Sequence, residues 1–420
     1  MQHQPVSFQA PVSGQGSPQT AIVVGGGIVG ATTAYFLARD GVDVTLIERE
    51  PGAGASVRSA GYISMVSRGP GPQLELANLS RTLYEQLGGE IGDFELRLAG
   101  ALVFYYEDQL PLIDGFIERR RADGLPIESY DGDTAREMSP LLPDDVVGAV
   151  HSLADGCIHP PKFVEALREA AARNGARLLN TEVLGLDIRS GRCTGVRTAE
   201  GRLDADVVAL TAGSWTAALL REAGYPFNMH HIRLQMAETA PIDERFEPNM
   251  YGPTLFHEYM FMRDLPAYDD DLVMHPLQRI MPEVGNLEMF VQRDDGRLAL
   301  GCPIQFVDGP STPRQPSVAG LAQLFGILGD HVPALQHLPV ERIWAGVTAQ
   351  TTDGVPVMGQ VGDVQGLYVG SGHGYGVTVG PGSGRVLADL MLGRTPEIDV
   401  EAFRYDRAAV TEAAGRAVAY

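Results

Sequence analysis

The feature that most restricts the fold is a glycine motif close to the N-terminus. Gly25, Gly27 and Gly30 form a G-x-G-x-x-G pattern between an apolar run at residues 21–24 and a helix-forming stretch at residues 31–39. In such a turn the first glycine permits the tight bend, the second lets the backbone approach a pyrophosphate, and the third lets the helix pack against the strand. The pattern therefore predicts the βαβ unit of a dinucleotide-binding domain.

The residues around this turn support a bound dinucleotide. The predicted helix follows the turn, so its N-terminus would face the phosphates with its partial positive charge. Residues 42–47 alternate like a buried strand and end in Glu48, which is placed to accept hydrogen bonds from a ribose 2′-hydroxyl. Glu48 favours an adenosine with a free 2′-hydroxyl over one that carries a 2′-phosphate. It does not decide between FAD and NAD as the bound dinucleotide. A glycine-rich turn in an unrelated α/β protein is the alternative interpretation.

Composition argues against several kinds of partner. The formal net charge of -21 disfavours nucleic acid and anionic membrane surfaces, because either would need clustered Lys and Arg. Cys157, Cys193 and Cys302 are far apart, so we expect no disulfide framework and no metal site. The uncharged stretch 21–38 contains glycines and begins like a strand, so we expect no membrane insertion. The N-terminus has no secretory signal pattern, and we expect a cytoplasmic protein.

Turn and strand patterns in the middle of the chain predict mostly antiparallel structure. Residues 183–188, 195–198 and 207–210 read as short strands that we expect to form a small meander. Residues 288–292 and 297–301 flank a turn and predict a hairpin, within a mostly antiparallel sheet from about 226 to 304. Helices are expected at residues 82–88, 110–123, 162–174, 318–328 and 384–392.

Further motifs follow Glu48 in a fixed order. They are the Ser-rich loop 49–61 ending in Ser59-Ala60-Gly61, the strand that starts at Val183, the sequence Ala212-Gly213-Ser214-Trp215, and the glycine-rich stretches 342–359 and 371–376. Together they resemble the D-amino-acid oxidase superfamily of FAD-dependent oxidoreductases. Within that family, hydroxyproline dehydrogenases, opine oxidase subunits and glycine oxidases are the nearer comparison.

The resemblance implies a fold class and a domain organisation. We expect an α/β protein in which a Rossmann-like FAD-binding domain of the glutathione reductase type is interleaved with an α+β substrate domain on a mostly antiparallel sheet. The expected parts are a flexible lead-in at 1–18, the FAD-binding domain at 19–90, 151–224 and 342–405, the substrate domain at 91–150 and 225–341, and a C-terminal tail at 406–420.

The resemblance also implies which residues contact FAD. Backbone N–H groups of the turn at 372–378 would approach the pyrimidine edge of the flavin, where negative charge gathers on reduction. An ordinary tight connection before the last helix is the alternative. The expected FAD contacts are Gly25, Gly27, Ile28, Val29, Gly30, Glu48, Arg49, Ser56, Arg58, Ser59, Ala60, Gly61, Val183, Ala212, Gly213, Trp215, Gly346, Gly372, His373, Gly374, Tyr375, Gly376, Val377 and Thr378.

One position departs from the family pattern. Relatives of the glycine oxidase kind carry an Arg in a Gly-x-Arg-x-x-Thr segment, and that Arg grips the substrate carboxylate. In this chain Thr348 stands at the Arg position, two residues after Gly346. Either another cation replaces the missing Arg, or the substrate is a secondary amine, an opine or a cyclic imino acid that is held differently. The candidate cations are Arg58, Arg233, Arg263 and Arg293.

The expected reaction demands little from side chains. A neutral amine passes a hydride from its α-carbon to flavin N5, and water hydrolyses the resulting imine. Candidate catalytic residues are His373, Tyr259, Tyr62, Thr348 and Tyr251. For His373 a loop-holding hydrogen bond is an equal alternative, and for the aromatic residues ordinary packing is the alternative.

The sequence thus predicts an FAD-dependent oxidoreductase that oxidises the C–N bond of a small-molecule amino acid, imino acid or secondary amine. Two other functions stay open at this point. One is FAD-dependent oxidation of an α-hydroxy acid. The other is a flavin subunit of a multi-subunit dehydrogenase, whose iron–sulfur partner would be another chain because this chain has no cluster-binding cysteine set. A homo-oligomer or an electron-acceptor partner fits either case.

We predict that FAD is bound noncovalently. Covalent attachment in the resembling family uses a Cys near the C-terminal flavin segment or a His near the N-terminal one, but this chain has no Cys in 303–420 and no His in 57–63. Acid precipitation of the purified protein should therefore leave a colourless pellet and a yellow supernatant. Yellow colour that stays in the pellet would contradict this prediction.

Overall fold

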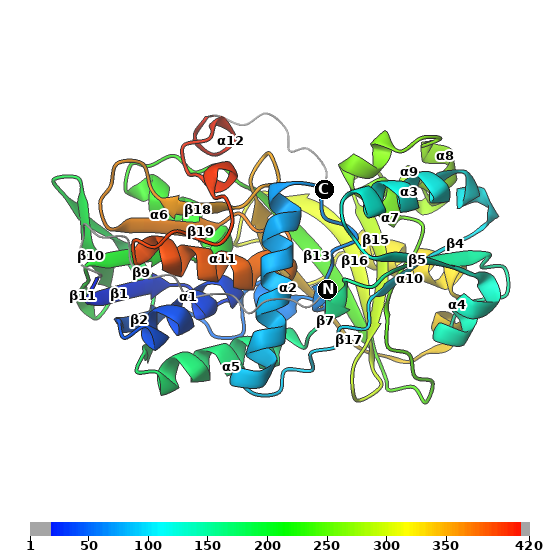
Figure 1. Ribbon diagram of the computed structural model, residues 1–420, viewed down its shortest axis with the longest axis horizontal. Coiled ribbons are helices and arrows are strands. Elements are labelled where there is room, and N and C mark those ends of the chain that lie inside the picture. The colour runs from blue at the N-terminus through cyan, green and yellow to red at the C-terminus, as the bar shows by residue number, and fades with distance from the viewer. Residues whose placement is uncertain (1–17, 413–420) are drawn as a thin grey trace.

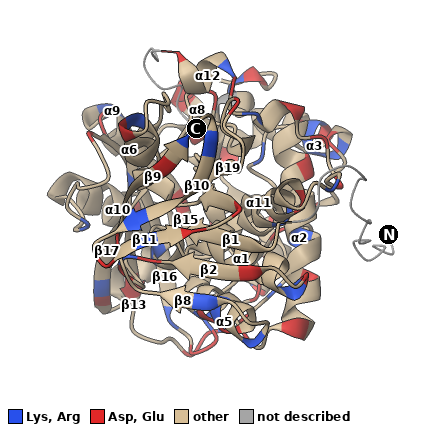
Figure 2. Ribbon diagram, turned by 90° about the vertical axis from the view of Figure 1, so that its left-hand side faces the viewer, with Lys and Arg blue, Asp and Glu red and all other residues tan. Residues whose placement is uncertain are grey.

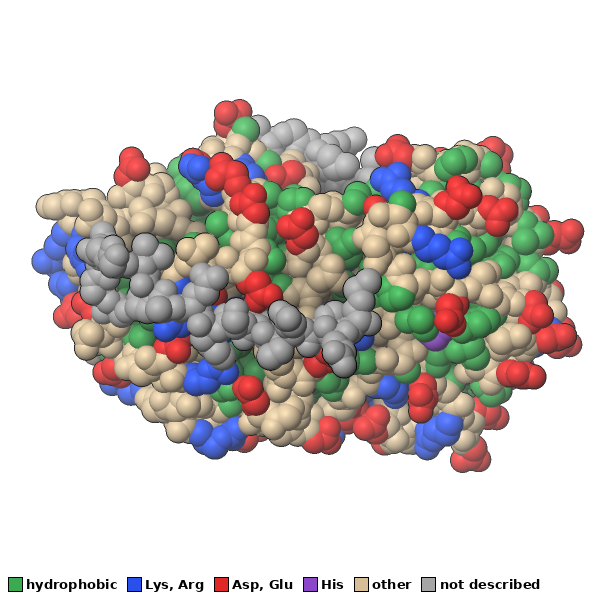
Figure 3. Space-filling model, viewed as in Figure 1, with side chains coloured by type: hydrophobic (Ala, Val, Ile, Leu, Met, Phe, Trp, Pro, Cys, Tyr) green, Lys and Arg blue, Asp and Glu red, His purple; other side chains and the backbone are tan. Residues whose placement is uncertain are grey.

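The computed structural model describes residues 18–412, which form two halves, each built around its own sheet (Figure 1). Most of the expected lead-in and residues 413–420 of the expected tail lie outside the described range. Within residues 18–412, no helix is both long enough and apolar enough to cross a bilayer. In Figure 2 acidic and basic residues are interspersed along the ribbon, and Figure 3 shows side chains of both signs interspersed on the face in view.

The first half contains a six-stranded, mostly parallel sheet. Its strands in spatial order are β18 (Val357–Gln360), β19 (Leu367–Ser371), β12 (Val207–Leu210), β1 (Thr20–Val24), β2 (Asp43–Ile47) and β8 (Arg177–Leu179). Every neighbouring pair is parallel except β18 with β19. The order β12-β1-β2 places the glycine turn after β1 at the carboxyl edge of the sheet, where open α/β sheets bind nucleotides.

Helices cover one face of this sheet and a small meander covers the other. The helices are α1 (Ile28–Arg39), α2 (Pro72–Glu90), α5 (Pro160–Arg173) and α11 (Gly376–Met391), and the meander strands are β9 (Val183–Arg189), β10 (Arg192–Thr198) and β11 (Gly201–Asp204). The alternation of β1 explains this sandwich: Ala21 and Val23 lie in the core with α1, whereas Ile22 and Val24 pack in the core with the meander.

The second half contains an eight-stranded, mostly antiparallel sheet. Its strands in spatial order are β17 (Val340–Gln350), β13 (His230–Thr239), β16 (Leu298–Val307), β15 (Gly285–Gln292), β14 (Asn249–Tyr251), β4 (Ala101–Tyr105), β6 (Gly148–Ser152) and β5 (Ile127–Asp131). Only β14 and β4 pair in parallel among these described strands. The expected hairpin is confirmed as β15 and β16. The expected fold class is therefore correct, whereas the exact domain boundaries stay a prediction.

Shorter elements complete the two halves. A two-stranded ribbon joins β3 (Tyr62–Ile63) to β7 (Gly156–Cys157). The remaining α-helices are α3 (Leu110–Ala122), α4 (Gly132–Met138), α6 (Thr216–Glu222), α7 (Leu255–Glu258), α8 (Asp270–Val273), α9 (Pro276–Ile280), α10 (Val318–His331) and α12 (Ala408–Thr411). The 3₁₀ turns are η1 (Ser56–Arg58), η2 (Glu107–Gln109), η3 (Gly213–Trp215), η4 (Met260–Asp264), η5 (Pro333–His337) and η6 (Glu401–Phe403).

Two expected elements were wrong in their placement. Residues 207–210 do not form the third strand of the meander; β12 pairs in parallel with β1, and β11 takes the place in the meander. The expected helix 82–88 begins ten residues earlier, at Pro72, since proline is favoured in a first helical turn. In both cases the local pattern identified the type of element and tertiary pairing decided its partner or its start.

The predicted start of helix α11 was also wrong, and packing explains the difference. The sequence predicts a helix from residue 384, because the preceding turn contains three glycines and Pro381, which are poor helix formers. In the structure those glycines allow a very close approach to α1 and α2. A Cβ added at Gly380 would lie 2.6 Å from Ile28 Cγ2, and one added at Gly384 would lie 2.6 Å from Thr32 Cβ. Packing of the two helices therefore overrides their poor propensity.

This contact predicts opposite effects for two glycine substitutions. Gly384→Ala should lower the free energy of unfolding by roughly 1–3 kcal/mol, because the new methyl group overpacks the contact with α1. Gly89→Ala in α2 has open space around the added Cβ and should raise it by up to about 1 kcal/mol through helix propensity alone. Urea unfolding of the two variants measures both values. Equal effects of the two substitutions would contradict the close packing of α1 and α11.

Candidate functional site

One elongated cavity joins the two halves of the molecule. Its lining begins at Gly25 and Gly27, in the turn between β1 and α1. It then passes the first turn of α11 and ends against side chains of the eight-stranded sheet, among them Met236, Met289 and Ile304. The cavity therefore offers space for an extended ligand in the first half and for a second molecule beside the second sheet.

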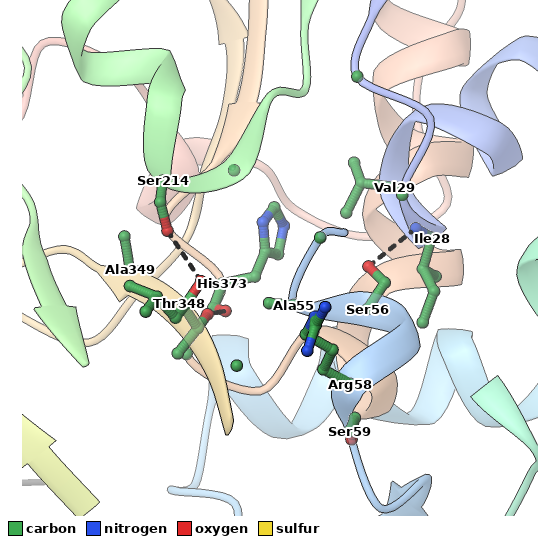
Figure 4. A pocket seen from close by; sticks show the side chains of 18 of the residues that line it. Ile28, Val29, Ala55, Ser56, Arg58, Ser59, Ser214, Thr348, Ala349 and His373 are labelled. Atoms are coloured by element: carbon green, nitrogen blue, oxygen red, sulfur yellow. Dashed lines mark hydrogen bonds between the residues drawn. The ribbon is translucent and has the colours of Figure 1, made fainter. Parts of the chain in front are cut away.

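The glycine turn fits a phosphate group closely. Gly25 has a φ of +106°, and a Cβ on it would lie 2.5 Å from the carbonyl oxygen of Thr211. A Cβ on Gly30 would lie 1.9 Å from the carbonyl oxygen of Gly25, so only glycine permits this contact between helix and strand. In the first turn of α1 the N–H of Ile28 donates to Ser56 Oγ, while those of Val29 and Gly30 find no acceptor inside the helix and can meet an anion. Ile28 and Val29 carry this turn into the cavity (Figure 4).

The loop after β2 closes over the turn. Ser56 Oγ accepts a hydrogen bond from the backbone N–H of Ile28 at 3.1 Å, as Figure 4 shows. Glu48 Oε2 accepts from the N–H of Gly26 at 2.9 Å, which holds the carboxylate at the end of β2 against the cavity. Glu48 is thus fixed where an acceptor for ribose hydroxyls is expected.

A second edge of the cavity is built from aromatic and charged groups. The guanidinium of Arg49 lies 5.0 Å from the ring centroid of Trp215 and forms a salt bridge with Glu182 at 2.7 Å. The neighbouring residue Val183 lines the same edge. This apolar and planar surround suits a flat ring such as adenine.

The other end of the expected cofactor site is the N-terminus of α11. Gly376, Val377 and Thr378 line the cavity and form the first turn of this helix, whose N–H groups lack acceptors within the helix. Residues 376–378 are therefore part of a helix rather than of the turn that the sequence predicted. The positive end of the helix dipole adds to the effect of these donors on a nearby negative charge. The geometry fits the pyrimidine edge of a flavin, which becomes negative on reduction.

His373 holds the turn before α11. Ser383 Oγ donates to the carbonyl oxygen of Val379 at 2.8 Å and lies 2.9 Å from His373 Nε2, so it accepts the ring N–H. Burial lowers the pKa of His373 to about 4. Thr348 Oγ1 donates to the carbonyl oxygen of His373 at 3.1 Å, and Figure 4 shows both residues at the cavity. Of the two expected roles for His373, these contacts support the loop-holding one.

A tyrosine cluster closes the cavity on the side of the second half. The ring centroids of Tyr62 and Tyr251 are 5.2 Å apart, and those of Tyr259 and Tyr375 are 6.2 Å apart. Tyr251 donates to Ser64 Oγ at 2.6 Å. Burial raises the pKa of Tyr62, Tyr251 and Tyr259, so all three keep their phenolic protons at neutral pH. Tyr62 and Tyr251 donate to the carbonyl oxygen of Met250 and to Ser64, which leaves Tyr259 as the donor of the three for a ligand within an otherwise apolar wall.

The structure brings nearly all of the predicted site residues to this one cavity. All five candidate catalytic residues line it, and so do the predicted cofactor residues except Gly30, Gly61 and Gly372. These three lie behind the wall and shape the backbone. Gly61 has a φ of +94°, and a Cβ on it would lie 2.1 Å from the carbonyl oxygen of Ile158. Their contact with FAD stays a prediction, and the crowding and backbone conformation at these positions explain why each is glycine.

Three of the four candidate cations lie outside the cavity. Arg233 bonds to the carbonyl oxygen of Gln315 and to Gln305, Arg263 to the carbonyl oxygen of His257, and Arg293 to the carbonyl oxygen of Ile158. Only Arg58 lines the cavity, where it bonds to the carbonyl oxygens of Ala53 and Ala345.

Sequence reasoning missed several lining residues from the second half and one cation. The apolar ones are Leu234, Met236, Leu287, Met289, Cys302 and Ile304, and the polar ones include Glu258 and Arg68. Arg68 had a signal in the sequence, because it is the first charged residue after the uncharged run 59–67 that follows Arg58. Within the described residues, no group of three or more His, Cys, Asp and Glu side chains could hold a metal ion.

Comparison with known proteins agrees with this geometry. The family model described as DAO, FAD dependent oxidoreductase, matches residues 20–390. A D-amino acid dehydrogenase of Methylobacterium sp. (strain 4-46) is 29% identical over 452 residues, which cover 92% of this chain and 99% of that protein. A glycine oxidase of Pseudomonas putida (strain KT2440) is 26% identical, with 90% of this chain and 96% of that protein covered.

The fold also matches solved structures. The crystal structure of glycine oxidase from Geobacillus kaustophilus superimposes with a TM-score of 0.79 at 24% sequence identity, and the match covers 94% of this chain and 99% of that one. At this level of identity the likeness establishes the fold alone. It confirms the expected combination of a Rossmann-like part with a second part built on a separate sheet.

The neutral state of His373 predicts a pH effect on stability. Because its folded pKa of about 4 lies below the ordinary value of 6.5, the unfolded chain binds this proton first, and stability is lost as the pH falls from about 6.5 to about 4. His373→Gln keeps an N–H donor for Ser383 and removes this titration. Urea unfolding between pH 7.5 and 4.5 should therefore show a shallower loss of stability in the variant than in the wild type. Parallel curves would contradict a neutral His373.

Proposed function

Because the chain belongs to the DAO family of FAD-dependent oxidoreductases, we propose that it oxidises the C–N bond of an amino acid, an imino acid or a secondary amine. One observation carries the proposal. A single cavity runs from the glycine turn, past the N-terminus of α11, to a wall of methionines and protonated tyrosines on the eight-stranded sheet. Two relatives are named as a D-amino acid dehydrogenase and a glycine oxidase, and these names support amino acids as the class of substrate.

The proposed reaction balances with FAD as the only oxidant. When bound, FAD supplies the acceptor for a hydride, which carries both electrons of the broken α-C–H bond. The lone pair of the amine nitrogen forms the C=N bond, and the amine N–H proton leaves to solvent or to a nearby base. Water then adds to the released imine and yields a carbonyl compound and ammonia or an amine.

The side chains of the cavity favour the reactive form of the substrate. Its nitrogen must have a free lone pair, so the neutral amine is the form that reacts. The apolar surfaces of Leu234, Met236 and Ile304 disfavour a bound ammonium ion, because burial penalises charge. Tyr259 keeps its proton and can donate a hydrogen bond that orients a polar substrate group, whereas Tyr251 donates its O–H to Ser64 and can only accept one. Positioning and exclusion of water are thus the contributions of this chain.

We extend the proposal to the organisation and location of the protein. Residues 19–90, 151–224 and 342–405 act as the FAD-binding part, and residues 91–150 and 225–341 act as the substrate part. The three cysteines are buried and unpaired in the described part of the chain, which supports a reducing compartment, the cytoplasm. Either oxygen or a partner protein would accept the electrons from reduced FAD.

An anaerobic reduction screen tests the proposed function. Purified holoprotein is mixed with amino acids, cyclic imino acids, secondary amines and α-hydroxy acids, and the flavin absorbance band is followed. We expect at least one compound with an oxidisable C–N bond to bleach the band, because its hydride reduces FAD. Bleaching by α-hydroxy acids alone would overturn the proposal. Admission of air then separates an oxidase, which re-oxidises rapidly, from a dehydrogenase that needs another acceptor.

A further inference from the structure

Arg68 is a buried cation at the cavity with an unused hydrogen-bond donor. Its relative exposure is 1%, and it lines the cavity beside the tyrosine cluster. Its Nε donates to the carbonyl oxygen of Ser64 at 3.2 Å, and its Nη2 donates to Ser67 Oγ at 2.8 Å. Its Nη1 is buried and finds no acceptor among residues 18–412. A charged donor left unpaired in this way is costly unless a ligand completes it.

The charged groups nearest Arg68 have partners of their own, since Arg120 Nη1 lies 3.3 Å from Asp123 Oδ2. Arg120 is also fully buried, and its Nη2 donates to the carbonyl oxygen of Arg68 at 2.9 Å. No salt bridge joins Arg68 to an acid anywhere in the described part of the chain. The nearby buried carboxyl of Asp155 is occupied by the N–H groups of Met65 and Val66, at 3.1 and 3.0 Å. The acids of this corner, Asp123 and Asp155, are therefore paired with groups other than Arg68.

The guanidinium of Arg68 is held rigidly, with one face covered. Its Cζ lies 3.1 Å from the ring centroid of Tyr375, which is the residue before the first turn of α11. The N–H of Ser64 donates to Thr378 Oγ1 at 3.0 Å and ties the loop of Arg68 to that same turn. Since one face of the guanidinium is stacked and two of its nitrogens are bonded, Nη1 is the donor that remains for a ligand. A planar anion bound there would lie beside the expected flavin position.

We propose that Arg68 binds the carboxylate of the substrate and so replaces the arginine that is missing at Thr348. The inference rests on the proposed oxidation of a C–N bond and specifies its substrate class as carboxylic acids with an α-nitrogen. Thr348 cannot take this role, because it is uncharged and its hydroxyl donates to the carbonyl oxygen of His373. A carboxylate fits better than an ammonium group, which a buried guanidinium repels, and it matches the guanidinium edge in shape.

The experiment compares the binding of benzoate, a carboxylate without an oxidisable nitrogen, with that of neutral benzamide. Shifts of the flavin absorbance band give both dissociation constants in the holoprotein. Arg68→Gln should weaken benzoate binding by roughly 30- to 1,000-fold and leave benzamide binding within a few-fold. Arg68→Lys, which keeps the charge but not the planar fork, should restore part of the benzoate affinity. The matched controls Arg233→Gln and Arg233→Lys change a guanidinium outside the cavity and should leave both constants as in the wild type.

The outcomes separate this inference from the proposed function. Unchanged benzoate affinity in Arg68→Gln, with its flavin content intact, would overturn the role of Arg68. If that variant loses FAD or does not fold, Arg68→Lys decides instead, and benzoate binding equal to the wild type would overturn the role. Equal kcat/KM of the wild type for an amino acid and for the matching amine without a carboxylate would also overturn it and leave C–N oxidation standing. Oxidation of α-hydroxy acids alone, lost in Arg68→Gln, would keep the anchor and reject the proposed function.

Discussion

The close contact between α1 and α11 is the constraint on which the site depends. At this contact α11 presents glycines to α1: Gly380 faces Ile28, and Gly384 faces Thr32. This approach brings the N-terminus of α1 and the N-terminus of α11 to the same cavity, although the two turns are separated by more than three hundred residues of sequence. A dinucleotide can then meet one helix end with its phosphates and the other with its reactive ring.

The second half of the molecule lines one side of the cavity with mostly apolar side chains. Its antiparallel strands β13, β15 and β16 present methionine and aliphatic side chains to the cavity, and the loop between β14 and β15 adds Tyr259. Polar groups are few there: they are the tyrosines, which burial keeps protonated, and Glu258, with Arg68 beside them. Such a surface can exclude water and orient a small molecule, which suits a reaction whose electron acceptor is a cofactor.

Local pattern predicted the parts of the site that depend on local geometry. The glycine turn and Glu48 follow from residues within thirty positions of one another, and the structure has them as expected, while α1 begins at Ile28, before the helix-forming stretch 31–39. The start of α11 could not be predicted in this way, because the contact with α1 that stabilises its glycine-rich first turns is made across the fold. The partner of β12 was missed for the same reason, since short apolar strands look alike whichever sheet they join. Met236, Met289 and Arg68 read as ordinary core or loop residues until folding places them at one cavity.

The six-stranded sheet is assembled from three distant parts of the chain, and this order has a consequence during synthesis. β1 and β2 leave the ribosome first, β12 follows after the first meander, and β19 with α11 comes only after the whole eight-stranded sheet has been made. Until then the apolar strands and the exposed face of α1 lack their last neighbours, and a nascent chain in this state is the form most exposed to aggregation. We therefore expect FAD to bind only after β19 and α11 have been synthesised and packed.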